Sequence, residues 1–287
     1  MLHTFPYYDP IHSNQGESMA IVISVATQKG GVGKTTTAVN LAHALAYKPN
    51  YKKVLVVDVD PQANSSLILG KVHPDQQPTS VVDVFEDKTK CFANCTVETK
   101  YKGVDLIASN IDLFLCGQSL GASNPAAVLG LQSKLDSITR DKYDFIIIDC
   151  PPNLGGPFVV NAMVISDYFL VPIESASMFA LNGVDQFLDS VDAIKGYSNS
   201  KLDLLGVLLT MYDPRTNASK VMEELVSERF GAKLFTTRIH RNTSIDQANM
   251  SMITVIDHDT KSSGAKNYRA LAREVLQRCG MPTTEQQ

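Results

Sequence analysis

The sequence lacks the patterns that mark membrane, secreted and metal-binding proteins. None of its apolar runs approaches the roughly 18 residues needed to span a bilayer. Residues 1–18 contain neither a basic start nor an apolar segment, so we expect no secretory signal there. The five cysteines are odd in number and form no CxxC pair, which argues against a zinc site or a redox dithiol. These absences favour a reducing, cytoplasmic setting in which the cysteines are structural thiols.

The charge balance excludes a protein that is basic over its whole surface. The net charge is −4 for 287 residues, with 44% hydrophobic and 20% charged residues, as in ordinary globular proteins. Residues 213–278 nevertheless contain eleven Lys and Arg against eight Asp and Glu. Any nucleic-acid binding would therefore depend on a local basic patch in this segment.

Short apolar runs alternate with stretches of helical periodicity along most of the chain. Continuous apolar runs of this length are typical of strands buried on both faces of a sheet. Their alternation with helices predicts an α/β fold in which helices cover both faces of a mostly parallel, twisted sheet. We expect strands at 21–26, 54–59, 104–107, 145–148, 168–173 and 204–210, and helices at 35–47, 125–140, 179–195, 218–230 and 264–279.

The same pattern predicts a single domain. It runs from residue 19 to residue 280 without an internal repeat or a linker rich in proline and glycine. Residues 1–18 are polar and have no useful periodicity, so we interpret them as a loose N-terminal extension. Residues 281–287 are interpreted as a polar tail.

The segment GGVGKTT lies where a predicted strand ends and a predicted helix begins. Glycines let backbone N–H groups surround a phosphate, and the helix N-terminus adds a partial positive charge. Lys34 would reach the β- and γ-phosphates, and the Thr35 hydroxyl would bind Mg²⁺. The general phosphate-loop pattern has glycine where this chain has Gln28. The pattern predicts a P-loop NTPase whose nucleotide-binding residues are Lys29, Gly30, Gly31, Val32, Gly33, Lys34, Thr35 and Thr36.

Acidic residues follow two other predicted strands. Asp58 and Asp60 come at the end of VLVVDVD, and Asp149 follows FIII. Because the carboxyl ends of parallel strands meet at the ligand edge of a sheet, these carboxylates are expected beside the phosphate loop. Asp149 is the candidate for the magnesium side of the site.

KGGVGKTT, DVDPQ and IIIDCPP, in this order, resemble the three motifs of the ParA/MinD family of deviant phosphate-loop ATPases, closest to partition ATPases without an N-terminal helix-turn-helix. The resemblance covers residues 19–280. It implies an ATP- and Mg²⁺-dependent homodimer in which Lys29 contacts the nucleotide of the opposite subunit. It also implies that Asp60 orients or activates the attacking water, and that Asp58 lies near the magnesium, with Thr35 and Asp149. Lys29, Lys34 and Asp60 are the catalytic candidates.

The same resemblance predicts which residues lie near the adenine and which residues contact DNA. Pro172 and Glu174, at the end of the run YFLVPIE, would lie near the adenine, with Thr210 and Met211 as another wall of that pocket. Arginines of the family bind DNA without regard to its sequence at the positions of Arg215 and Arg241. A further arginine that the family commonly has is Ser244 here. Lys266 and Arg269 complete the DNA-binding candidates.

These features together predict an ATP-dependent dimerising switch that binds double-stranded DNA and drives plasmid or chromosome partition. A ParB-like partner would stimulate hydrolysis, and the protein would be cytoplasmic and associated with the nucleoid. An alternative is a relative that positions another cargo on the nucleoid. A second is a membrane-surface ATPase like MinD; we favour a terminal helix packed in the core and expect no membrane partner. A third, a reductase or metal carrier, would need paired interface cysteines at a spacing that is absent here.

Overall fold

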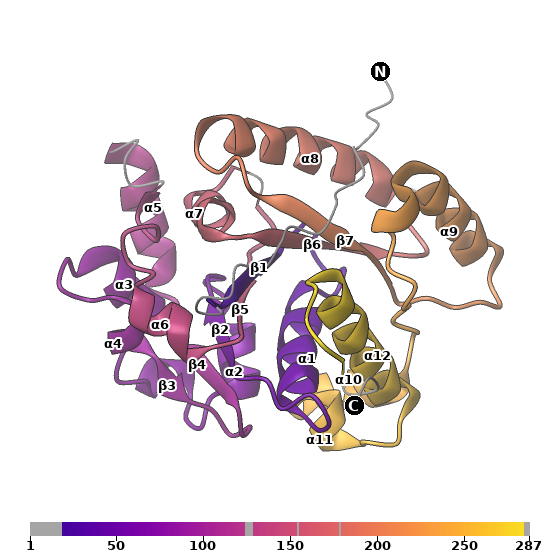
Figure 1. Ribbon diagram of the computed structural model, residues 1–287, viewed down its shortest axis with the longest axis horizontal. Helices are drawn as coiled ribbons and strands as arrows, with labels where there is room; N and C mark the ends of the chain where they lie inside the picture. The colour runs from indigo at the N-terminus through magenta and orange to yellow at the C-terminus, as the bar shows by residue number, and fades with distance from the viewer. Residues whose placement is uncertain (1–18, 124–128, 154, 178, 284–287) are drawn as a thin grey trace.

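Six parallel strands and one antiparallel edge strand form a single sheet in the computed structural model (Figure 1), which describes residues 19–123, 129–153, 155–177 and 179–283. The strand order is β3-β4-β2-β5-β1-β6-β7. Helices cover both faces, so the predicted fold class is confirmed. Residues 1–18 and 284–287, at the two predicted ends, lie outside the described residues, whereas Met281 donates a backbone hydrogen bond of 2.8 Å to the Leu276 carbonyl.

Each predicted strand is present, with bounds within about one residue of those expected from the sequence. A seventh strand, β3, was not predicted, because a run of two residues carries no periodicity. The strands are β1 Ile21–Val25, β2 Val54–Asp58, β3 Val97–Glu98, β4 Val104–Ile107, β5 Phe145–Asp149, β6 Tyr168–Glu174 and β7 Asp203–Thr210.

Side chains that alternate along each strand enter two separate cores. Leu55 and Val57 pack on the face covered by α7 and α8, whereas Val54 and Val56 pack on the face covered by α1 and α12 (Figure 1). All four side chains are fully buried. Each contributes about 1.5–3 kcal/mol of hydrophobic stabilisation, which explains why the strands have continuous apolar sequences rather than alternating ones.

The last helix, α12, packs into the second of these cores. Tyr268, Leu271 and Leu276 are buried against the face that α1 also covers, so the preference for a core-packed terminal helix is confirmed. Among the described helices, none is both long and apolar enough to cross a membrane. The α-helices are α1 Lys34–Ala46, α2 Asn64–Leu69, α3 Val81–Glu86, α4 Phe92–Cys95, α5 Leu113–Ser123, α6 Ser137–Lys142, α7 Pro157–Ile165, α8 Phe179–Tyr197, α9 Asn217–Phe230, α10 Thr243–Met250, α11 Val255–His258 and α12 Ser263–Arg278.

The helix predicted over 125–140 is wrong over residues 129–136 and confirmed over residues 137–140, which belong to α6. Residues 129–135 form turns, and α6 begins only at Ser137, where the Asp136 carboxylate caps it. Long-range hydrogen bonds occupy the backbone groups that a helix would use. The Leu131 N–H donates to Asn161 Oδ1 at 2.9 Å, and the Lys134 carbonyl accepts from the Phe92 N–H at 3.1 Å. Residues 124–128 lie outside the described residues.

The buried side chain of His43 connects α1 to Thr254, the residue that caps α11. His43 Nδ1 lies 2.6 Å from Thr254 Oγ1, and its ring contacts the rings of Tyr47 and Tyr101. Burial lowers the pKa of His43 to about 4, against a smaller opposing effect of the Asp257 carboxylate. His43 is therefore neutral in the folded protein at neutral pH.

This pKa predicts a loss of stability in mild acid. Between pH 6.5 and about 4 the unfolded chain binds a proton at His43 that the folded protein does not, so the free energy of unfolding falls as the pH falls. The full pKa difference corresponds to about 3 kcal/mol. Urea unfolding of the wild type and of His43→Gln between pH 7 and pH 4 checks it, because the other titrating groups are common to both proteins. The wild type should lose more stability than the variant, and parallel curves would contradict the prediction.

Candidate functional site

The loop between β1 and α1 has the shape of a phosphate cradle. Gly31 and Gly33 adopt left-handed backbone angles, with φ of 75° and 84°, which side chains other than glycine rarely accept. A Cβ atom added to Gly30 or Gly31 would meet no other atom within 4 Å, so the loop borders open space. No side chain caps the first turn of α1. Its backbone N–H groups therefore face a site suited to an anion.

Lys34, the first residue of α1, is a buried cation that contacts no carboxylate of the described residues. Its side chain is 7% exposed, and Nζ donates to the Lys29 carbonyl at 3.0 Å. Burial lowers the pKa of Lys34, whereas the nearby groups Asp149, Cys150 and Asp60 raise it. No ion pair involving Lys34 exists within the described part of the chain. A buried ammonium needs a compensating anion, and a nucleotide phosphate fits this position.

Asp149 has an unused oxygen beside this cation. It ends β5, in register with Val25 of β1 and with Asp58 of β2. Its Oδ2 accepts a hydrogen bond of 2.8 Å from Ser65, but Oδ1 is buried and accepts none from the described residues. Burial raises the pKa of Asp149 to about 6, although hydrogen bonds from Ser65 and Thr35 lower it.

Asp149 and the Thr35 hydroxyl form a donor set that fits Mg²⁺. The described residues contain no group of three or more His, Cys, Asp or Glu able to hold a metal ion by themselves. Mg²⁺ at nucleotide sites commonly binds one or two protein oxygens together with substrate phosphates. One carboxylate and one hydroxyl beside a phosphate loop meet that requirement.

Asp58 and Asp60 have different environments. Both Asp58 oxygens are occupied: Oδ1 accepts from the Asp60 N–H at 3.1 Å, and Oδ2 from the Ser66 N–H and hydroxyl at 2.9 and 2.7 Å. These contacts favour a structural role, and magnesium binding by Asp58 stays a prediction. Asp60 is buried, accepts from the Gln62 N–H at 2.9 Å, and lies close enough to Lys34 to influence its pKa. Its role toward water also stays a prediction.

Lys29 contacts Glu174, which is one of the predicted base-pocket residues. Its Nζ donates to Glu174 Oε2 and to Ser177 Oγ, both at 2.8 Å. The Lys29 side chain is 39% exposed. A pair this exposed contributes about 1 kcal/mol or less, so another anion can replace the carboxylate. The contact of Lys29 with a second subunit's nucleotide stays a prediction.

The remaining base-pocket candidates surround the end of β7. The buried Thr210 hydroxyl lies 2.9 Å from the Val32 carbonyl oxygen and 3.1 Å from that of Ile173, and its single proton is shared between these two acceptors. Thr210 therefore holds the phosphate loop against β6 and β7. Pro172 is buried within β6, and Met211 has a left-handed φ of 50°. Contacts of these residues with adenine stay predictions.

The structure brings together three segments that carry DNA-binding candidates. The Arg241 N–H donates to the Tyr212 carbonyl at 3.0 Å, which places Arg241 beside the turn that contains Arg215. The His240 N–H donates to Asn267 Oδ1 at 3.2 Å, next to exposed Lys266 on α12. Arg269, one turn further along α12, is half-buried and donates to the Thr260 carbonyl.

Several other basic residues of 213–278 serve the fold instead. Arg238, for example, is 2.7 Å from Glu223 and is mostly buried. The basic composition of the segment therefore overstates the charge available to a ligand. The residues in such ion pairs are Arg229 with Asp185, Lys233 with Asp203, Arg238 with Glu223 and Arg278 with Glu274.

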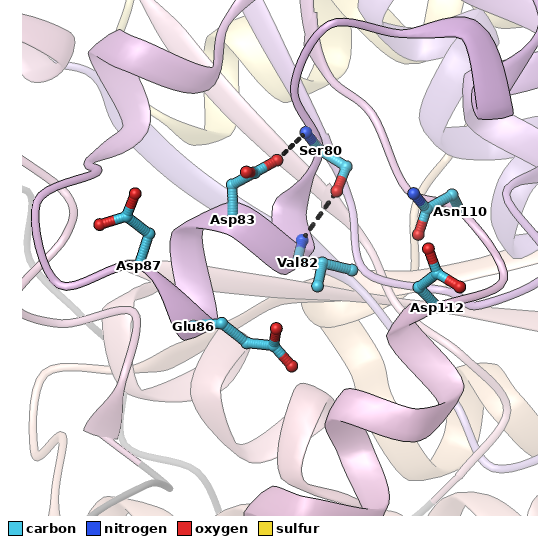
Figure 2. A pocket seen from close by; sticks show the side chains of 7 residues that line it. All are labelled: Ser80, Val82, Asp83, Glu86, Asp87, Asn110 and Asp112. Carbon is cyan, nitrogen blue, oxygen red and sulfur yellow. Dashed lines mark hydrogen bonds between the residues drawn. The ribbon is translucent and has the colours of Figure 1, made fainter.

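An acidic hollow of about 420 Å³ lies at the other end of the sheet (Figure 2). It is formed by α3 and the segment after β4, which β2 and β5 separate from the phosphate loop. The basic turn follows β7 at the opposite edge. This separation gives the molecule an acidic end and a basic end. The hollow is lined by Ser80, Val82, Asp83, Glu86, Asp87, Asn110 and Asp112.

Sequence reasoning missed the hydroxyl groups that hold the charged residues. Ser65 and Ser66 orient Asp149 and Asp58, respectively. Ser175 and Ser219 meet below the basic turn, 3.0 Å apart between hydroxyl oxygens. Ser65 and Ser66 follow DVDPQ closely, which was a weak signal. Nothing in the sequence indicates the contact between Ser175 and Ser219, because it joins residues 44 positions apart.

Comparison with known proteins extends these observations. A family model described as "AAA domain" matches residues 20–204. The chromosome partitioning protein ParA of Caulobacter vibrioides is 36% identical over 258 residues, which cover 90% of this chain and 94% of that protein. The sporulation initiation inhibitor protein Soj of Bacillus subtilis is 37% identical over 257 residues, which cover 90% of this chain and 98% of that protein.

A solved structure gives the corresponding likeness in three dimensions. Cobyrinic acid a,c-diamide synthase from Mycobacterium smegmatis, with bound ADP and magnesium, has a TM-score of 0.77 and 32% sequence identity. The match covers 92% of this chain and 99% of that chain.

The position of Thr210 predicts a specific effect on nucleotide affinity. Thr210→Val keeps the shape of the side chain but removes the hydroxyl that bonds the Val32 carbonyl of the phosphate loop, at a cost of about 1–2 kcal/mol. We expect a loss of roughly 5- to 30-fold in affinity for a Mg²⁺-ATP analogue, measured by calorimetry. Thr210→Ser retains the hydroxyl and should bind as the wild type does. Equal affinities of the valine variant and the wild type would contradict the role given to Thr210.

Proposed function

Because the chain belongs to the ParA/MinD family of ATPases, we propose that it is a nucleotide-driven switch of the partition type, which assembles on DNA with ATP and leaves it after hydrolysis. The chain is an ATPase whose cofactors are ATP and Mg²⁺. In this proposal the ATPase domain spans residues 19–280, between flanking segments 1–18 and 281–287.

The observation that carries the proposal is the pair formed by a buried cation and an unused carboxylate oxygen. Lys34 holds its ammonium against the phosphate loop, and Asp149, at the end of β5, has a buried Oδ1 that accepts no hydrogen bond from the described residues. Bound Mg²⁺ supplies charge neutralisation between the phosphates and the protein. Thr35 and Asp149 would hold it. Asp60, at the neighbouring strand end, would orient the attacking water.

Lys29 provides the connection between two subunits. Its present partners, Glu174 and Ser177, are on the same chain, and a triphosphate carries more negative charge than one carboxylate. In the proposed dimer Lys29 leaves Glu174 for the nucleotide of the other subunit. Hydrolysis then removes charge from that contact and weakens the dimer.

Lys29→Ala tests the shared contact. With a non-hydrolysable ATP analogue, we expect the wild type to sediment as a dimer and the variant as a monomer that still binds nucleotide. ATP turnover should fall about 100-fold, as is usual when a charged group that stabilises a transition state is removed. Lys88→Ala, an exposed lysine in the acidic end, is the matched control and should dimerise normally. A dimeric, fully active Lys29→Ala would exclude the proposed role.

The basic turn and the start of α12 support binding to the DNA backbone. Three exposed basic residues come from three segments of the chain: Arg215, Arg241 and Lys266. Hydrogen bonds link these three segments to one another. Contacts between such side chains and phosphates give affinity that is independent of sequence and weakens with salt. The acidic hollow at the opposite end of the sheet would repel a second duplex, so DNA is expected on one side only.

Arg215→Glu tests the DNA contact. The variant places a negative charge where we propose a phosphate to lie, so DNA binding at moderate salt should be lost. Fluorescence anisotropy with a duplex of random sequence and an ATP analogue measures this. Lys88→Glu makes the same change of charge type in the acidic end and should retain DNA binding. Retained binding by Arg215→Glu would refute the assignment.

A protein partner and a cargo complete the proposal. The relative named for chromosome partitioning supports a DNA cargo. The proposal adds a nucleoid location in the cytoplasm and a ParB-like stimulator of hydrolysis. A fold shared with a diamide synthase does not by itself distinguish a switch from an amide-forming enzyme. Acceleration of ATP hydrolysis by a ParB-like protein and DNA together would support the partition role, whereas acceleration by an amide donor and acceptor would support the other.

A further inference from the structure

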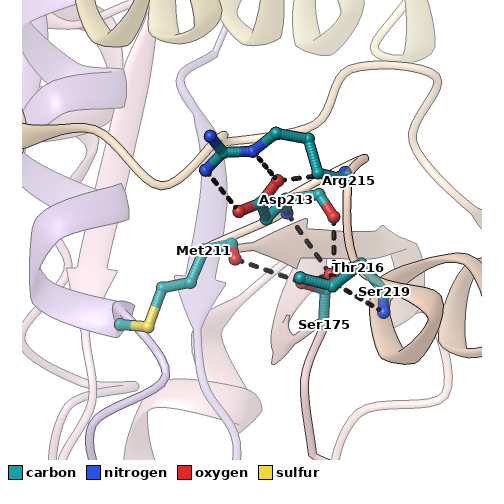
Figure 3. Close-up of polar contacts among 6 residues, drawn as sticks. All are labelled: Ser175, Met211, Asp213, Arg215, Thr216 and Ser219. Carbon is teal, nitrogen blue, oxygen red and sulfur yellow. Dashed lines mark hydrogen bonds and ion pairs between the residues drawn. The ribbon is translucent and has the colours of Figure 1, made fainter.

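The Asp213 carboxylate already forms an ion pair with Arg215, the arginine that we propose to contact DNA. Arg215 donates three hydrogen bonds to it (Figure 3): from the backbone N–H to Oδ1 at 3.0 Å, from Nε to Oδ1 at 2.9 Å, and from Nη2 to Oδ2 at 2.8 Å. Such a two-pronged arginine–carboxylate contact uses the same donors that a phosphate would use. A phosphate that binds this edge of the guanidinium, through Nε and Nη2, must therefore exchange with Asp213.

Asp213 cannot easily move away, because the turn beneath it is anchored. Its N–H donates to Ser219 Oγ at 3.3 Å, and its carbonyl accepts from the Thr216 N–H and hydroxyl at 3.1 and 3.0 Å. Ser219 in turn contacts the buried Ser175 hydroxyl at the end of β6. Figure 3 shows these contacts between the turn and the strand ends. The backbone of Asp213 is thus held in place, which keeps its carboxylate beside Arg215.

The exposures of the two side chains also differ. The Arg215 side chain is 87% exposed, whereas that of Asp213 is 19% exposed. An incoming phosphate can reach the guanidinium, but it then lies beside a fixed negative charge. Arg241 offsets part of that charge, because it helps to lower the pKa of Asp213, which Arg215 holds at about 2. The carboxylate is therefore ionised throughout the range in which the protein would meet DNA.

We propose that Asp213 competes with DNA phosphates for Arg215 and thereby makes DNA binding depend on two protomers acting together. The inference rests on the proposed function, in which Arg215 contacts DNA. Competition lowers the affinity of each turn, so that one protomer alone binds too weakly. In a dimer the second turn binds at high effective concentration, and the two weak contacts multiply. Asp213 is a positioning residue that sets the threshold for nucleotide-dependent binding.

Asp213→Asn is the variant that isolates the charge. Asparagine has the same shape and also accepts the backbone hydrogen bond of the turn, so the local conformation is preserved. DNA affinity is measured by anisotropy for the wild type, Asp213→Asn, Arg215→Ala and the double variant. Each protein is measured with ADP and with a non-hydrolysable ATP analogue, over a series of salt concentrations. Asp213→Ser, which also favours the turn, serves as a second variant should the asparagine variant fail to fold.

We expect Asp213→Asn to bind DNA more tightly than the wild type. An exposed pair of this kind corresponds to a gain of about fivefold for each protomer, and about 25-fold for a dimer whose two turns bind together. The ADP-bound variant should bind DNA at low salt, where the wild type does not. Its affinity should also decrease more steeply with salt, since Arg215 then contributes fully to phosphate neutralisation. In the Arg215→Ala background the gain should vanish.

Two results would overturn the inference, and they differ from failure of the proposed function. Unchanged or weaker DNA binding by Asp213→Asn, with Arg215→Ala still impaired, would show that Asp213 does not compete. A gain that persists in the double variant would show that it acts as a general negative charge rather than through Arg215. Wild-type DNA binding by Arg215→Ala would instead remove Arg215 from the DNA contact and refute the function on which the inference rests.

Discussion

The proposed site depends on a buried ammonium group that forms no ion pair with any residue the structure describes. Lys34 lies at the start of α1, where a left-handed glycine turn and unused backbone N–H groups face the same space. Asp149 ends the neighbouring strand with one buried oxygen that receives no hydrogen bond from the described residues. Neither group is stable in isolation in a protein interior. Together they fit the phosphate and the Mg²⁺ of the proposed nucleotide site, and the other predicted site residues lie along the same edge of the sheet.

This arrangement connects the nucleotide to the surface through short steps. β6 ends in Glu174, which pairs with Lys29, and the next residue, Ser175, contacts the scaffold of the Arg215 turn. The Thr210 hydroxyl joins the phosphate loop to β6 and β7. Lys29 is the residue that we propose to contact the nucleotide of the second subunit, and Arg215 is the residue that we propose to contact DNA. Both therefore connect to the same end of β6. Exchange of a carboxylate for a phosphate is the physical event proposed at both.

Much of the fold and the phosphate loop could be predicted from sequence, for identifiable reasons. Strands buried on both faces leave continuous apolar runs, and the glycines and Lys34 follow one of them directly. What could not be predicted depends on contacts between distant segments. The helix expected over 125–140 is absent from residues 129–136, where Leu131 donates a hydrogen bond to Asn161 across the fold. The hydrogen bond from Ser66 to Asp58 and the contact of Lys29 with Glu174 likewise could be identified only from the three-dimensional structure.

The central claim is that Lys29 changes its partner from Glu174 of its own chain to a triphosphate held by a second copy. A crystal structure of the protein with Mg²⁺ and a non-hydrolysable ATP analogue tests it most directly. The account predicts a two-fold dimer in which each Lys29 Nζ lies within hydrogen-bonding distance of the phosphates bound to the other protomer. A nucleotide-bound monomer whose Lys29 still contacts Glu174 and Ser177 would contradict it.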